Sequence, residues 1–448
     1  MSKDEYLITD APLKALTVFA MPMILGSFFQ QIYNMADSII VGQFVGSSAL
    51  AAVGACAALT NVFICVALGA GVGAGVLVSR YFGARDYGKM KTIVSTSLIS
   101  FLVLSILLGI FGFCFSHSMM SLLQTPADIL DEAVLYLRVY FVGFPFLFMY
   151  NILSTMFTSI GESRIPLVLL IFSSVLNIFM DLWMVAGLGL GVFGAALATL
   201  IAQGISAVFS FLIFLYRMRR YKCQFEWFDG QELYSMLQIA VPSVLQQSTV
   251  SIGMMIVQAV VNPFGTQALA GYSATMRVEN VFSLIFVSIG NAISPYISQN
   301  LGAKKYQRIR KGVHSGTYMA LLTSVVISGV MVLFGRNILS LFVSGEPEQI
   351  RQVLDIAYKY LFIMAIFLWV LYLLYVYRSA IQGLGNTLIP LASGIAEFVM
   401  RVSVALLLPK LIGEDGIFYA EICAWTSAAV LLFISYMIII RKYKEYNC

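Results

Sequence analysis

The chain of 448 residues is 60% hydrophobic and only 11% charged, whereas soluble domains average about a quarter charged residues. A soluble protein of this length cannot bury so much apolar surface, so a lipid bilayer must be its solvent. The net charge of +5 comes from short basic loops between apolar runs, a pattern typical of membrane orientation and not of nucleic-acid binding.

Long apolar runs follow one another along the whole chain, and each is long enough to cross a bilayer, which takes about 20 residues. Their length without strand-like alternation predicts helices, which satisfy every backbone hydrogen bond internally. We expect about twelve spans, at residues 13–43, 50–79, 92–116, 131–158, 165–186, 191–216, 236–261, 267–297, 313–335, 353–381, 388–409 and 417–440. The predicted fold class is an all-α integral membrane protein.

Lysine and arginine gather in the loops that follow even-numbered spans, at residues 80–91, 217–222 and 304–311. The loops after odd-numbered spans carry few basic residues and are otherwise acidic. Basic loops stay on the cytoplasmic side. The sequence therefore predicts a multi-pass protein of the cell (inner) membrane with both termini in the cytoplasm.

The two halves of the chain resemble one another at a spacing of about 220 residues. Matching segments are AMP at 20–22 with AVP at 240–242, YFGARDYGKMK at 81–91 with NLGAKKYQRIR at 300–310, and GESRIPL at 161–167 with GNTLIPL at 385–391. Each half holds six spans, so both insert the same way up. We predict two lobes, 1–218 and 233–448, joined by a cytoplasmic linker at 219–232 and related by a pseudo-twofold axis along the membrane normal. Transporters place substrate sites at such repeat interfaces.

Two acidic residues lie inside apolar runs of the first half. Asp37 and Asp181 are each about five or six residues before the outer end of their span, so a rise of about 1.5 Å per residue puts them at similar depth. Asn177 shares a helix face with Asp181, and Thr199 lies about eight residues into the next span. Carboxylate, amide and hydroxyl oxygens suit a small hard cation such as Na⁺, and paired carboxylates can also hold a proton. An intramembrane acid is functional by default, so we predict one cation-coupling layer in the first lobe.

The second half carries a different set of charges, which we expect to be buried: Arg277, Glu279, Arg378, Glu397 and Arg401. The repeat aligns Asp37 with Val257, Asp181 with Ala405 and Asn177 with Arg401, so this lobe lacks the acid pair. Glu397 and Arg401 have the spacing of an intrahelical ion pair. A structural ion pair and a conformational or substrate-contact role both stay open, and Glu279 has two basic candidates nearby.

Pro22 interrupts the first span, which also contains Gln30, Gln31 and Asn34. A proline kinks a membrane helix and frees a carbonyl group. We consider both a static kink and a moving one that links protonation of Asp37 to movement of this span.

Several segments resemble the multidrug and toxic compound extrusion (MATE) family: the Ala-Met-Pro of the first span, YNMADSIIVGQFVG, SRYFGARD, SQNLGAKK, GESRIPL and NIFMD. The resemblance covers nearly the whole chain. It implies a two-lobed, V-shaped bundle with a central cleft, and a secondary antiporter without cofactor or enzymatic activity. Members expel organic cations and other amphipathic compounds in exchange for H⁺ or Na⁺.

The family's first-lobe cation site falls on Asp37, Asn177, Asp181 and Thr199, with Tyr136 matching a tyrosine that often accompanies it. Bending at the proline of the first span, here Pro22, is another implied feature. One branch of the family keeps its main acid in the second lobe, where Glu279 is the only comparable residue here.

The sequence leaves two alternatives to efflux. A flippase for a lipid-linked sugar needs a strongly basic cleft, for which Arg277, Arg378 and Arg401 are candidates. An intramembrane aspartyl protease needs GxGD around one acid, but Ile-Phe-Met precedes Asp181. The expected partners are small organic molecules and the bilayer, with no nucleic acid, and we expect a monomer.

Overall fold

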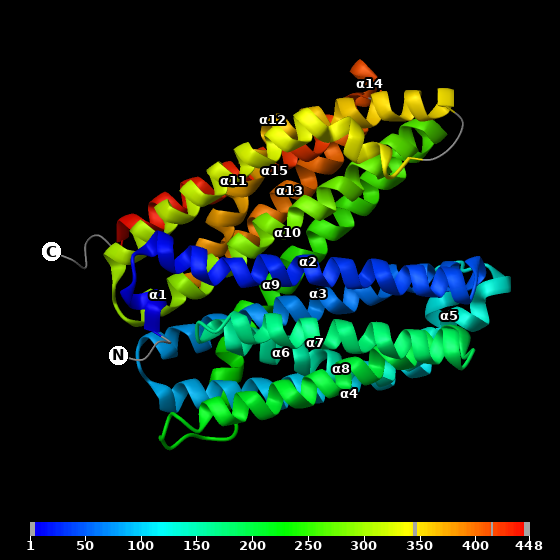
Figure 1. Ribbon diagram of the computed structural model, residues 1–448. Helices are drawn as coiled ribbons and strands as arrows, with labels where there is room; N and C mark the ends of the chain where they lie inside the picture. The colour runs from blue at the N-terminus through cyan, green and yellow to red at the C-terminus, as the bar shows by residue number, and fades with distance from the viewer. Residues whose placement is uncertain (1–4, 344–346, 414, 443–448) are drawn as a thin grey trace. The chain divides into compact units, whose positions relative to one another are not determined.

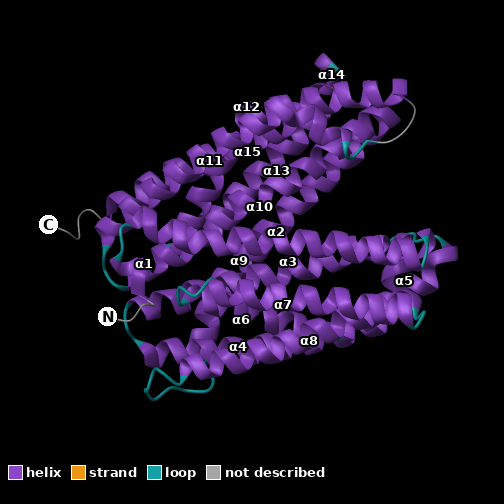
Figure 2. Ribbon diagram, in the orientation of Figure 1, coloured by secondary structure: helices purple, strands orange, loops and turns teal. Residues whose placement is uncertain are grey.

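The computed structural model describes residues 5–343, 347–413 and 415–442, and Figure 2 shows that this part of the chain consists of helices joined by loops and turns, with no strand. The helices, drawn in Figure 1, are α1 (Tyr6–Thr9), α2 (Pro12–Phe44), α3 (Ser47–Gly83), α4 (Tyr87–Leu122), α5 (Ala127–Val142), α6 (Phe144–Ser159), α7 (Arg164–Asp181), η2 (Leu182–Gly187), α8 (Gly191–Met218), α9 (Gly230–Val261), η3 (Asn262–Phe264), α10 (Thr266–Gly302), α11 (Tyr306–Ser340), α12 (Pro347–Gly383), α13 (Leu388–Leu407), α14 (Pro409–Ile412) and α15 (Asp415–Lys442).

Within this described part, eleven helices are long and apolar enough to cross a membrane, or up to twelve when the bent pair of α5 and α6 is taken as one span. This confirms the predicted all-α membrane fold. Many helices extend beyond the predicted apolar runs, because backbone hydrogen bonding continues past the hydrocarbon. The predicted span 131–158 is bent by 51° at Gly143, after which Phe144 and Pro145 start α6.

The helices group into two compact units, residues 1–20 with 241–448 (unit 1) and residues 21–240 (unit 2). The predicted lobes, 1–218 and 233–448, have different limits. The unit boundaries lie inside α2 and α9, next to Pro22 and Pro242, which are the only prolines inside those helices.

Polar contacts attach the segment before Pro22 to unit 1 and the segment before Pro242 to unit 2. In unit 1, the Asn300 side chain donates to the Leu7 carbonyl at 3.0 Å and Arg308 donates to the Asp10 carbonyl at 2.6 Å. In unit 2, the Tyr81 hydroxyl lies 3.2 Å from Glu232 Oε1. Residues 219–232, the predicted linker, fall within unit 2.

Aromatic and aliphatic side chains fill the core of unit 2, where Phe141, Phe144 and Phe148 are fully buried. In contrast, Leu107, Ile110 and Val175 on α4 and α7 are about 60% exposed. An apolar surface of this kind is stable only against lipid tails, as the composition predicts.

Candidate cation site in unit 2

Asp37 on α2 and Asp181 at the end of α7 come together inside unit 2. Their side chains interact with one another. Asp181 is fully buried and Asp37 partly so. The sequence placed them at similar depth on separate spans; the helix packing brings them into one site.

Asn177 and Thr199 complete the layer beside Asp181. With its amide oriented to match its neighbours, Asn177 donates to Asp181 Oδ2 at 2.8 Å and accepts from the Thr199 backbone N–H at 3.1 Å. The Thr199 hydroxyl lies 3.2 Å from the same amide and 3.1 Å from the Ala195 carbonyl of its own helix. The amide thus fixes Asp181 against α8.

Two tyrosines border the acids. Tyr136 of α5 is partly buried and lies in the electrostatic field of Asp37. Tyr33 interacts with both acids and with Thr199. The sequence reasoning missed Tyr33, although its position four residues before Asp37 places both side chains on one face of α2.

Asp181 is also the last α-helical residue before the π-helical turn η2. In that turn the backbone pairs at wider spacing, a feature that occurs frequently at functional sites. The sequence predicted an uninterrupted span here.

The arrangement can hold one small cation or one proton. Oδ1 of Asp37 and Oδ1 of Asp181 are buried and have no donor among the described residues. Ionised carboxylates only accept hydrogen bonds, so a proton or a cation shared by two interacting acids would offset their repulsion. No group of three or more histidine, cysteine or acidic side chains suited to a metal ion occurs in the described ranges. The donors are hard oxygens, which fit Na⁺ in character.

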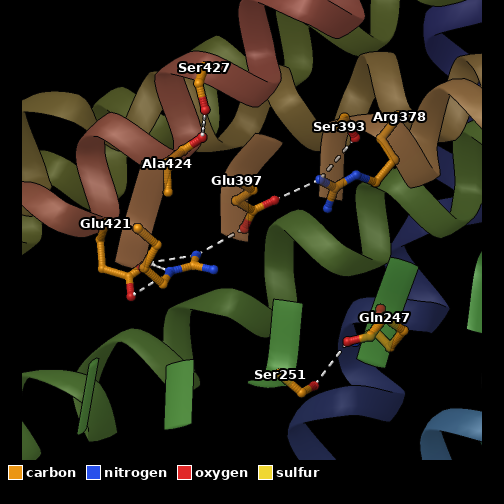
Figure 3. A network of polar contacts seen from close by, with 9 residues as sticks. Gln247, Ser251, Arg378, Ser393, Glu397, Glu421, Ala424 and Ser427 are labelled. Atoms are coloured by element: carbon orange, nitrogen blue, oxygen red, sulfur yellow. Dashed lines mark hydrogen bonds and ion pairs between the residues drawn. The ribbon is translucent and has the colours of Figure 1, made fainter. Parts of the chain in front are cut away.

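Unit 1 contains a buried ion-pair network on α12, α13 and α15, shown in Figure 3. Glu397 accepts from Arg378 at 2.8 Å and from Arg401 at 2.9 Å. Arg401 also contacts both oxygens of Glu421, at 2.8 to 3.1 Å. The predicted Glu397–Arg401 pair is therefore present, and Glu421 is a partner that the sequence reasoning missed.

Glu279 and Arg277 lie apart from this chain of pairs. Glu279 is buried and interacts electrostatically with Arg401 and Glu421, but its Oε2 has no donor among the described residues. Arg277 is exposed, contrary to the expectation that it is buried, and lines a cavity of about 400 Å³ with Thr266 and Gln349. Residues two apart on a helix point to nearly opposite sides, which separates the two.

Known proteins are similar to this chain over nearly all of its length. The chain is 26% identical to the probable multidrug resistance protein YoeA of Bacillus subtilis, covering 96% of this chain and 94% of that protein. It is 26% identical to the multidrug export protein MepA of Staphylococcus haemolyticus, covering 97% and 96%. The solved structure of a MOP superfamily transporter from Pyrococcus furiosus superposes with a TM-score of 0.92 at 22% identity, covering 99% of each chain.

The MatE family model matches residues 22–183 and 242–407, one match in each half of the chain. These matches include Asp37, Asn177 and Asp181 of the acid layer and Glu397 and Arg401 of the network. The chain therefore belongs to the MATE family of multi-pass membrane transporters and is not an enzyme.

Proposed function

We propose that this protein is an antiporter that exports amphipathic organic cations and other toxic compounds in exchange for H⁺ or Na⁺. The observation that carries the proposal is the interaction between Asp37 and Asp181, whose Oδ1 atoms have no donor among the described residues. The names of the relatives YoeA and MepA support the substrate class.

In this mechanism the acid pair takes up the coupling ion from one side of the membrane and releases it to the other. Asn177 holds Asp181 Oδ2, so Oδ1 is left to the ion. Thr199 and Tyr136 supply neutral oxygen atoms around it. Each positive charge that moves inward gains about 2.3 kcal/mol per 100 mV of membrane potential, which drives alternating access and outward transport of the substrate.

The orientation that we propose follows the distribution of lysine and arginine, with both termini in the cytoplasm. The protein acts as a single chain in the cell membrane. In this orientation Asp37 and Asp181 lie in the outer half of the membrane, where an ion from outside reaches them.

A flippase for an anionic lipid-linked sugar is less well supported. Such a substrate needs uncompensated basic side chains. Arg378 and Arg401 are instead paired with Glu397 and Glu421, so their charges are neutralised. Of the three candidates this leaves Arg277, which is exposed on a cavity, and one arginine does not make a strongly basic cleft.

The test is efflux of a fluorescent organic cation from proteoliposomes with a pH gradient and a Na⁺ gradient imposed separately. We expect one gradient to drive efflux in the wild type and neither to do so in Asp37→Asn or Asp181→Asn. Asp355→Asn is the control, because this acid is half exposed and pairs with Arg336 far from the layer in sequence. Wild-type rates from either layer variant would overturn the proposal.

A further inference from the structure

The loop from Arg219 to Asp229, which joins α8 to α9, combines exposed aromatic and basic side chains. Trp227 is 72% exposed and Phe228 48%. Arg219 and Lys222 of the same loop are also exposed. Phe225 is also 37% exposed, and exposed apolar side chains grouped together in this way mark an interaction surface.

The backbone of this loop is tied to the beginning of α4. The Glu226 N–H donates to Thr92 Oγ1 at 3.0 Å, and the Asp229 N–H donates to Thr96 Oγ1 at 3.0 Å. Ser95 donates in turn to the Glu226 carbonyl at 3.1 Å. Figure 1 shows the loop, in green, beside the start of α4. Trp227 and Phe228 are therefore held outward on an anchored backbone.

These contacts also set the depth of the loop. α4 begins after its N-cap Asp86, and Thr96 is ten residues further along, or about 15 Å at 1.5 Å per residue. The predicted apolar span of α4 starts at residue 92. The aromatic residues 225–228 thus lie at the level where α4 enters the hydrocarbon, which is where tryptophan concentrates in membrane proteins.

The charges of the loop favour an anionic partner. Arg219 and Lys222 flank the aromatic residues on the side of α8. Of the two acids, Asp229 caps α9 by accepting from the Gln231 N–H at 2.7 Å, which leaves Glu226 as the exposed acid. Lysine and arginine next to a span attract anionic lipids.

We propose that the 219–229 loop is a docking site for anionic lipid headgroups, with Arg219 and Lys222 binding the phosphate and Trp227 and Phe228 inserted beside the upper acyl chains. This site lies outside the acid layer and does not depend on which ion is coupled. It ties unit 2 to one leaflet of the membrane.

The test uses the purified full-length protein in vesicles of phosphatidylcholine and phosphatidylglycerol at a fixed ratio. Bromine, which quenches tryptophan, is placed on the chains of one lipid or the other. The chain has four tryptophans, so Trp227→Phe is subtracted from the wild type to isolate Trp227. We expect brominated phosphatidylglycerol to quench Trp227 at least about twofold more than brominated phosphatidylcholine does.

In the double variant Arg219→Gln/Lys222→Gln, the two brominated lipids should quench Trp227 equally. Arg310→Gln/Lys311→Gln, which removes the same charge from the first turns of α11, should keep the preference. Equal quenching in the wild type would disprove headgroup recognition. Absence of quenching by either lipid would disprove membrane docking and turn the search to a protein partner for the same surface.

Discussion

Arg401 binds Glu421 through two nitrogen atoms, with Nε 3.1 Å from both carboxylate oxygens and Nη2 2.8 Å from Oε2. Both side chains are fully buried. Because both charges are shielded from solvent, each depends on the other for compensation.

Breaking this pair should destabilise the protein strongly. We expect Glu421→Gln to lower the free energy of unfolding by about 3–5 kcal/mol, because Arg401 then keeps a buried charge with only Glu397 to balance it. The measurement is the thermal unfolding midpoint in detergent. Arg336→Gln, which breaks the half-exposed pair with Asp355, should cost at most about 1 kcal/mol. An equal loss in both variants would show that burial does not set the energy of these pairs.

Removal of the Asn177 amide should impair coupling without removing an acid. In Asn177→Leu, Asp181 Oδ2 loses its donor at 2.8 Å, and a hydrogen bond to a charged group contributes about 1.5–3 kcal/mol. We expect ion-driven efflux to fall about tenfold or more, since about 1.4 kcal/mol is a factor of ten. Ser174→Ala, on the same helix and with no partner for its hydroxyl among the described residues, should transport normally. Unchanged efflux in Asn177→Leu would exclude a positioning role for this amide.

The two repeat-matched prolines offer a comparison between a moving and a static kink. Alanine at either position restores a backbone N–H and removes a ring clash, which should stabilise α2 or α9. If the kink at Pro22 moves with protonation of Asp37, Pro22→Ala should reduce efflux while raising the unfolding temperature. Pro242→Ala should raise that temperature and keep efflux, because Val257 stands in α9 where α2 has Asp37. Full efflux from Pro22→Ala would contradict a functional movement of α2 at Pro22.

Close packing of α3 against α9 depends on Gly73. A Cβ at this position would lie 2.6 Å from the Met236 carbonyl oxygen and 2.9 Å from Ala240 Cβ, so the backbones must separate. We expect Gly73→Ala to lower the free energy of unfolding by about 1–3 kcal/mol. Gly54→Ala in the same helix meets nothing within 4 Å and should be neutral or slightly stabilising. Thermal unfolding of both variants in detergent checks this, and equal midpoints would contradict the packing argument.

Much of the site could be predicted from the sequence because a charged side chain inside a bilayer is costly and therefore rare. Acids inside apolar runs such as those holding Asp37 and Asp181 have few tolerable positions. The four-residue spacing of Asn177 and Asp181, and of Glu397 and Arg401, is fixed by helical geometry alone. The number of spans and the internal repeat follow from hydropathy and from matching segments in the same way.

The tertiary structure decided the relationships that depend on contacts between distant helices. Glu421 lies near the start of a predicted span, so its sequence position did not show that α15 would present it to Arg401. The bend at Gly143 and the π-helical turn after Asp181 are local backbone adjustments that apolar runs do not encode. The unit boundaries at Pro22 and Pro242 depend on contacts such as Asn300 with Leu7. Hydropathy and helical period fix what each span contains and which face a side chain occupies, whereas only packing fixes which faces meet.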